Sequence, residues 1–412
     1  MIALFLIPLY ILVNAYAVRW MLLWMGSCHH LFQSMPFRIL FIGIYIFLAT
    51  TLLTGFLIKK PFQLHHILKS IGNYFLGMFL YILMTIITAD LIHLILKYGF
   101  HTSWVKTQTA FIISGFLCTM IIVILSIHGI LNTYKLKIHP YEVTIDKDVQ
   151  QMDSLKIVLL ADLHFGHSVN HHHAARIVRK INQQHPDLVC IAGDIFDNDY
   201  DAISDPNEIT RCLKSIQTRY GVYACWGNHD LNEPILAGFT FKKTGSPYED
   251  PRMEEMLKKA DIRLLNDESV LIDHTFYLIG RKDPSRCKKT GESRKTPDQL
   301  TKELDRRKPI IFMDHQPKEL QEISYAGADL DLCGHTHDGQ IFPGNLTTHF
   351  IWENSCGYLK KDNMHNIVTS GAGVWGPNMR IGTNNEICSI TVYFQSDPRP
   401  CHPDPEARKT LS

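Results

Sequence analysis

Residues 155–164 read LKIVLLADLH, an apolar run that ends in two polar side chains. A short apolar run bounded by polar residues is typical of a strand buried on both faces of a sheet. The pattern returns in residues 188–194, which read LVCIAGD, and in residues 222–230, which read VYACWGNHD. Residues 174–184 and 209–219, which separate these runs, have the periodicity of helices. Alternating strands and helices predict an α/β domain with a largely buried sheet.

Side chains of metal-ligating types follow five apolar runs of this domain. In chain order the clusters are Asp162-Leu163-His164, Gly193-Asp194, Gly227-Asn228-His229-Asp230, Asp314-His315 and Gly334-His335-Thr336-His337. A single Asp or His after a strand is more often a surface loop residue. Five such clusters indicate a shared site, because the carboxyl ends of neighbouring parallel strands converge in space.

The ligand types at these positions are oxygen and imidazole, without an obligatory thiolate. This set suits Mn²⁺, Fe²⁺ or Zn²⁺ in a reactive site better than a structural zinc knot. The ligand positions are too many for one ion. Two divalent ions about 3.5–4 Å apart, sharing a carboxylate, would clamp a phosphoryl group and generate a bridging hydroxide. The pattern therefore predicts hydrolysis without a nucleophile from the protein.

The five clusters resemble the signature of the calcineurin-like metallophosphoesterases, which is D-x-H, G-D, G-N-H-[DE], a lone H and G-H-x-H. All elements occur in order between about residues 155 and 390. The chain is most similar to a bacterial membrane-anchored, phosphodiesterase-like branch, whose last motif reads G-H-T-H-G-G-Q and is followed by a Gly-rich stretch with an Arg. Here residues 334–340 read GHTHDGQ and residues 369–382 supply the later stretch. Asp338 replaces a glycine of that pattern and adds a carboxylate beside the site.

The resemblance implies a four-layer αββα sandwich and a role for each matched residue. Asp162, His164 and His337 would hold the first ion, Asp194 would bridge both ions, and Asn228, His315 and His335 would hold the second. His229 would contact the scissile phosphate and protonate or stabilise the leaving oxygen. Asp230 would orient the ring of His229, since a carboxylate beside an imidazole fixes its tautomer and favours its protonated form. No further cofactor is implied.

Other polar residues near the first motifs allow more than one interpretation. Asp197 either supports the ligands from behind or caps a turn. The adjacent histidines at 171–173 cannot all point at one centre, so we expect them in a solvated loop near a helix start and not among the ligands. His167 alone remains a candidate for substrate contact.

The first third of the chain is dominated by apolar residues. Residues 2–25, 39–58, 71–96 and 109–131 each exceed the ~18 residues at which a membrane span is expected, which predicts an all-α, multi-span membrane region. Asp90 and His93 lie near the end of the third run, where they either reach the membrane interface or mark an intramembrane site.

Basic residues between the spans predict the orientation. Five flank one side (Lys59, Lys60, Lys69, Lys135 and Lys137) and three flank the other (Arg38, Lys97 and Lys106). Because cytoplasmic loops carry an excess of Lys and Arg, we expect a multi-pass cell-membrane protein whose two termini and metal-binding domain are cytoplasmic.

The chain thus divides into a membrane anchor (1–133), a linker entering a first strand (134–154), a metallophosphoesterase-like domain (155–395) and a Pro-rich disordered tail (396–412). Residues 281–302 are polar and basic and are expected to form a surface excursion. The ten cysteines form no C-x-x-C pair, which favours buried or free thiols over a disulfide framework. A net charge of +1 and the lack of a basic run argue against a nucleic-acid partner.

The leading hypothesis is a membrane-anchored, two-metal phosphohydrolase that cleaves phosphodiester or pyrophosphate bonds. Its partners would be the membrane and a phosphate ester substrate, with lipid- or nucleotide-linked substrates favoured because the anchor holds the site near the headgroups. An alternative is a degenerate domain that senses metal or ligand without turnover, but this predicts missing ligands and all are present. A transporter would need more polar groups or broken helices within the spans.

Overall fold

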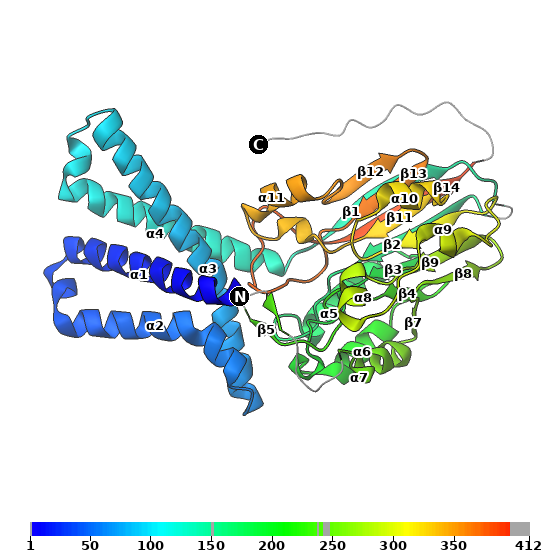
Figure 1. The fold of residues 1–412 in the computed structure, drawn as a ribbon, viewed down its shortest axis with the longest axis horizontal. Helices are drawn as coiled ribbons and strands as arrows, with labels where there is room; N and C mark the ends of the chain where they lie inside the picture. The colour runs from blue at the N-terminus through cyan, green and yellow to red at the C-terminus, as the bar shows by residue number, and fades with distance from the viewer. Residues whose placement is uncertain (1, 150–151, 237–238, 242–247, 396–412) are drawn as a thin grey trace.

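The computed structural model describes residues 2–149, 152–236, 239–241 and 248–395. A helical anchor stands beside a mixed α/β domain, and the two are in contact along one side (Figure 1). The expected tail, residues 396–412, lies outside the described residues.

The anchor consists of four helices, each long and apolar enough to cross a membrane, as the sequence predicts. Their bounds are α1 Ile2–Cys28, α2 Met35–Leu57, α3 Phe62–Leu94 and α4 Gln108–Thr133. With the π-helical turn Ile95–Gly99, the third segment has 38 residues and a length of about 57 Å, which exceeds the ~30 Å hydrocarbon layer. Its first turns can therefore reach beyond the layer.

Asp90 bonds to side chains of another helix of the anchor. Its carboxylate accepts hydrogen bonds from the Tyr16 hydroxyl at 2.6 Å and from the Trp20 indole at 3.0 Å, so it ties α3 to α1. Both partners precede it by some 70 residues, which is why the local sequence could not reveal this role.

The α/β domain contains two six-stranded sheets. The first has the order β1-β14-β2-β3-β4-β7 and the second β12-β13-β11-β10-β9-β8. The bounds in the first sheet are β1 Leu136–Ile145, β14 Asn385–Phe394, β2 Ser154–Leu160, β3 Leu188–Ala192, β4 Val222–Cys225 and β7 Ile262–Leu264. Those in the second are β12 Gly357–Lys361, β13 Met364–Val368, β11 Leu330–Cys333, β10 Ile310–Met313, β9 Phe276–Gly280 and β8 Glu268–Ile272. A short ribbon pairs β5 Ile235–Leu236 with β6 Phe239–Thr240.

The sheets pack face to face and helices cover their outer faces, which confirms the predicted αββα sandwich. Inward side chains of both sheets, such as Ile157 and Ile311, share one buried cluster. The helices α5 His171–Asn182, α6 Pro206–Lys214 and α7 Pro251–Lys259 pack on the first sheet. The helices α9 Pro297–Thr301 and α10 Leu320–Tyr325 pack on the second. Two further short helices, α8 Pro284–Thr290 and α11 Gly344–Ile351, lie in connections.

Two segments outside the predicted strands and helices of the domain are ordered parts of it. The segment expected to be a linker entering a first strand contains β1, which pairs in parallel with β14 along its whole length. The prediction that residues 281–302 form a surface excursion is wrong for Arg281. This side chain is 1% exposed and bonds to Asp314 at 2.8 Å. A buried cation in a basic segment was not evident because its carboxylate partner lies 33 residues away.

The cysteine prediction is confirmed for the described part of the chain, where all nine cysteines are free and most are buried. Cys190, Cys225, Cys333 and Cys388 lie in the strands of the two sheets, where they fill space as small apolar side chains.

Candidate dinuclear metal centre

The predicted ligands converge where the carboxyl ends of parallel strands meet. Asp162 and His164 follow β2, Asp194 follows β3 and Asn228 follows β4 of the first sheet, while His315 follows β10 and His335 and His337 follow β11 of the second. Both sheets therefore contribute to the centre. It lies at the edge of the sandwich where the parallel strands of both sheets have their carboxyl ends.

The carboxylate and imidazole ligands form two groups that can each hold a metal ion. One consists of Asp162, His164 and His337, and the other of Asp194, His315 and His335, with the ligand atoms of each group within 4.8 Å of one another. These are the groups that the resemblance implies.

Asp194 lies between the two groups. Its Oδ2 atom is 3.1 Å from Nε2 of His315 and 3.8 Å from Nε2 of His164. Nε2 of His164 is also 3.0 Å from Nε2 of His337, and Oδ1 of Asn228 is 3.1 Å from Nε2 of His315. A cluster of imidazole nitrogens and carboxylate oxygens at these separations fits two divalent cations that share Asp194.

The backbone is strained where it presents the ligands. Asp162, His164, Asp194, His335 and His337 have φ angles of 55°, 48°, 51°, 76° and 51°, in the left-handed region that non-glycine residues rarely adopt. Such conformations gather at functional sites, where the surrounding structure enforces them. Glycine is needed beside them, since a Cβ at Gly227 would lie 2.2 Å from Oδ1 of Asp194 and one at Gly334 would lie 2.3 Å from the Ala161 Cβ.

Burial keeps two histidines of the centre, His335 and His337, neutral, whereas Asp194 raises the pKa of His315 well above its ordinary value against the effect of burial. Removal from water, followed by the charge of His315, lowers the pKa of His335 well below its ordinary value. Burial, His164 and Arg380 do the same for the pKa of His337. Because the neutral imidazole is the form that binds a metal, these side chains are ready to coordinate without losing a proton.

The environment of His229 differs from the expectation that Asp230 orients its ring. Nδ1 of His229 bonds to the side-chain oxygen of Asn198 instead. The Asp230 carboxylate accepts from the backbone N–H of Phe196 at 2.8 Å and of Gly227 at 2.7 Å. Asp230 therefore fastens the loop through backbone N–H groups, while the ring of His229 lies 5.2 Å from that of His164 in the centre.

Arg380 is a residue of the site that received no role from the sequence. Its side chain is fully buried, and its Nη atoms lie 3.2 Å from both Nδ1 and the carbonyl oxygen of His337. It also donates to the carbonyl oxygens of Ser370 at 2.7 Å and Gly373 at 2.9 Å. One guanidinium thus ties the His337 loop to the Gly-rich stretch. The only sequence signal for this role was that Arg380 lies in the Gly-rich stretch at residues 369–382.

The remaining candidates near the first motifs fall into two environments. Asp197 is close to the centre, with Oδ1 3.6 Å from Nδ1 of His164, so it supports a candidate ligand. The expectation of a solvated histidine loop is wrong for His173, which is 8% exposed and bonds through Nε2 to the Ala372 carbonyl oxygen at 2.7 Å. The three histidines at 171–173 form the first turn of α5, and neither ligand group includes them.

The first turns of α3 form a wall beside the metal centre. Nζ of Lys69 donates to the Ile235 carbonyl oxygen at 2.9 Å, and the rings of His65 and His66 lie 4.9 and 5.3 Å from that of His167. Lys59, His65, Lys69 and His167 line a cavity of about 50 Å³ together with Asp197, which in turn contacts His164. Burial lowers the pKa of His167 to about 3. The anchor therefore contributes cationic side chains close to the candidate ligands.

Comparison with known proteins agrees with this geometry. Residues 155–339 match the family described as "Calcineurin-like phosphoesterase". A "Transmembrane protein with metallophosphoesterase domain" of Danio rerio is 26% identical over 287 residues, covering 67% of this chain and 62% of that protein. An "Uncharacterized metallophosphoesterase" of Helicobacter pylori is 30% identical over 243 residues, covering 58% of this chain and 60% of that protein. The chain thus spans about three fifths of the length of these two relatives.

A third relative is named for an enzymatic activity. It is the "UDP-2,3-diacylglucosamine pyrophosphatase LpxG" of Chlamydia trachomatis, which is 22% identical over 230 residues, covering 48% of this chain and 68% of that protein. The family match spans all five clusters that form the centre, together with the strand that leads into the first of them. The fifth cluster lies at the end of the matched segment. Residues 155–339, which contain both groups of candidate ligands, are thus similar to the calcineurin-like phosphoesterases.

Proposed function

We propose that this chain is a membrane-anchored, two-metal phosphohydrolase that cleaves phosphodiester or pyrophosphate bonds. The observation that carries the proposal is the position of Asp194 between two complete groups of ligands. Asp162, His164 and His337 would hold one ion, Asn228, His315 and His335 would hold the other, and Asp194 would be shared by both. The ions are Mn²⁺, Fe²⁺ or Zn²⁺, which these oxygen and nitrogen ligands suit.

The bound ions would supply polarisation of the phosphoryl oxygens and a hydroxide at neutral pH. His229 assists the leaving oxygen. Its backbone N–H donates to Oδ1 of Asp194 at 2.7 Å, which fixes the residue against the bridging carboxylate, and its ring lies 5.2 Å from that of His164. Asn198 holds Nδ1 of the ring, so that Nε2 is left to contact the substrate.

The substrate is a lipid-linked phosphate ester or anhydride. Two observations support this: α3 forms a wall of the site through Lys69 and His65, and one relative is named as a pyrophosphatase of a diacylated sugar nucleotide. The charges flanking the spans favour a cytoplasmic domain in a multi-pass cell-membrane protein.

The test is an assay of the full chain in detergent with Mn²⁺, using a chromogenic phosphodiester and the matching monoester. We expect metal-dependent turnover of the diester that Asp194→Asn abolishes. The control is Asp187→Asn at the opposite end of the sheet, where Asp187 bonds to the Lys156 N–H at 2.8 Å. Two bound ions without turnover of either compound would contradict the proposed hydrolase and favour a metal-binding sensor.

A further inference from the structure

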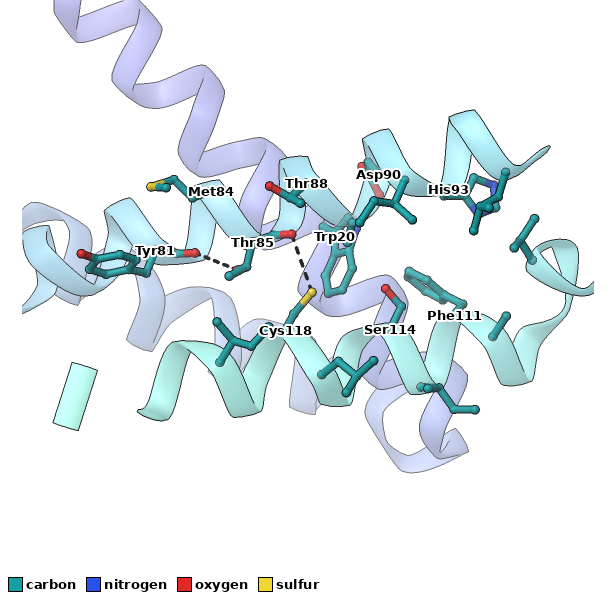
Figure 2. Close-up of a pocket in the computed structure, with 18 of the residues that line it drawn as sticks. Trp20, Tyr81, Met84, Thr85, Thr88, Asp90, His93, Phe111, Ser114 and Cys118 are labelled. Carbon is teal, nitrogen blue, oxygen red and sulfur yellow. Dashed lines mark hydrogen bonds between the residues drawn. The ribbon is translucent and has the colours of Figure 1, made fainter. Parts of the chain in front are cut away.

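A crevice of about 600 Å³ lies between α3 and α4 within the membrane-spanning region, and side chains of the two helices face each other across it (Figure 2). It extends along α3 from Tyr81 to Leu96, about 22 Å at 1.5 Å per residue, and along α4 from Ala110 to Leu125. Its volume is in the range of pockets that bind small molecules, ~300–1,000 Å³. An elongated apolar ligand matches this shape.

Several polar groups along the crevice are already bonded within the protein. Thr85 donates through its hydroxyl to the Tyr81 carbonyl oxygen at 2.7 Å, and the Cys118 thiol lies 3.7 Å from the Thr85 carbonyl oxygen. The Asp90 carboxylate accepts hydrogen bonds from Tyr16 and Trp20 of α1. Most of the other side chains that line the crevice are apolar, which favours hydrocarbon over a polar headgroup there.

One end of the crevice is formed by the loop of the metal centre. The Tyr81 hydroxyl donates to the carbonyl oxygen of Phe342 at 3.1 Å, and Phe342 lines the crevice five residues after the candidate ligand His337. Tyr81 also packs with Ile341 and Met379 in one buried cluster. The anchor crevice and the ligand loop are thus continuous.

The helix α11, which follows this loop, carries apolar side chains that are not covered by the described protein. Leu346, Phe350 and Ile351 are 50%, 91% and 71% exposed. The helix lies on the side of the domain that faces the anchor (Figure 1), and the ring of Trp352 directly after it packs edge to face with that of His335, with 5.2 Å between the ring centres. Apolar side chains beside a membrane anchor are accommodated at the bilayer interface. The crevice end and the metal centre then lie at the depth of lipid headgroups.

We propose that the crevice between α3 and α4 holds an acyl chain of the lipid on which the metal centre acts, with the headgroup phosphate passing Phe342 towards that centre. The inference rests on the proposed function for the reaction, whereas occupancy of the crevice stands on its own. A free acyl-chain site in the anchor explains why the chain has four helices where one would be enough for attachment.

The test uses the full chain in nanodiscs that contain phosphatidylglycerol with a photoreactive diazirine at the end of one acyl chain. We expect cross-links, located by mass spectrometry, on residues of α3 and α4 that line the crevice, such as Thr85 and Leu117. Ile121→Trp, which fills the crevice, should reduce this labelling about tenfold, because excluding even two methylene groups from a site weakens binding by that factor. Ile124→Trp is the matched control, since Ile124 lies on the same helix, is 56% exposed and does not line the crevice.

A second measurement links the crevice to the metal centre. Phosphatidylglycerol should inhibit hydrolysis of the chromogenic diester by the wild type and by Ile124→Trp. For Ile121→Trp, with inhibition expressed as a fraction of its own rate without lipid, about tenfold more lipid should be needed for the same inhibition. Equal labelling and equal inhibition of the two variants would overturn the proposal. If the crevice is labelled specifically but the protein hydrolyses neither the chromogenic diester nor the matching monoester, the proposed function is contradicted and the acyl-chain site is still supported.

Discussion

Asn198, and not the adjacent Asp230, holds Nδ1 of His229. Burial lowers the pKa of His229 to about 4, with the charge of Asp194 opposing the shift, so near pH 7 only a minor protonated fraction of the ring can give a proton to the leaving oxygen. A neutral amide at position 198 leaves this pKa low, whereas a carboxylate would raise it.

Substitutions at Asn198 should therefore change the pH profile of the proposed reaction. Asn198→Asp adds a negative charge beside His229, favours its protonated form and should move the alkaline limb of kcat to higher pH. His229→Ala should reduce kcat by about 10²–10⁴, the usual effect of losing a general acid. Asp230→Asn is the comparison: it leaves one buried N–H without an acceptor and should cost about 1–3 kcal/mol of stability without moving the pH profile. Identical profiles for the wild type and Asn198→Asp would contradict the leaving-group role.

The bridging position of Asp194 predicts coupled loss of two ions. Asp194→Asn should lower the metal content, measured by mass spectrometry of the purified full chain, at both sites. Asp162→Asn should affect the site of His164 and His337 first, because Asp162 belongs to that group alone. Metal removal by a chelator should lower the melting temperature of the wild type, since an ion that binds only the folded state stabilises it by mass action. Retention of two ions by Asp194→Asn would show that this carboxylate does not bridge.

The contacts of Arg380 predict a structural role in the His337 loop. Arg380→Lys keeps the charge but cannot reach His337, Ser370 and Gly373 at once, because an ammonium lacks the planar fork of a guanidinium. We expect a loss of about 3–5 kcal/mol, the usual effect of disrupting a buried charge with its partners. The metal site of His337 should be weakened more than that of His315. Arg179→Lys, on α5, is a control in which little should change.

Asp331 predicts a pH dependence of stability remote from the ligands. It is fully buried in β11, and burial together with the charge of Asp314 raises the pKa of its carboxyl to about 7 from an ordinary 3.8. Between pH 4 and 7 the folded protein thus retains a proton that the unfolded chain has released. Stability should fall as pH rises through this window, by up to ~4 kcal/mol.

The variant Asp331→Asn stays neutral at every pH and can still accept the hydrogen bond that Asn366 donates at 2.9 Å. Its melting temperature should exceed that of the wild type at pH 8 and approach it at pH 4, as measured on the full chain in detergent. A constant difference between the two proteins across this range would show that Asp331 does not titrate there.

Lys69 offers a test of the anchor as part of the site. Lys69→Gln can keep the hydrogen bond to the Ile235 carbonyl oxygen while removing the positive charge. We expect KM for an anionic phosphodiester to rise about tenfold, because one charge-assisted contact is lost. The change in kcat should be smaller. Lys60→Gln, in the same hairpin but outside the cavity beside His167, is the matched control and should leave KM unchanged. The same KM for both variants would remove Lys69 from the substrate site.

The sequence by itself determined the four apolar helices, the α/β class of the domain and the order of the candidate ligands, while the αββα layering was implied by the resemblance. These features depend on local patterns: apolar runs of a certain length need a membrane, and strands such as β2 and β3 end in polar residues that their parallel pairing brings together.

Only the tertiary structure decided which side chains support the centre. Adjacency in the chain suggested Asp230 as the partner of His229, but the Asp230 carboxylate binds backbone N–H groups instead, and Asn198, 31 residues away, contacts Nδ1 of His229. The wall formed by Lys69 and the buried Arg380 likewise depends on contacts across 166 and 43 residues. Such pairs are selected by the packing of whole elements, for which a local sequence pattern carries no signal.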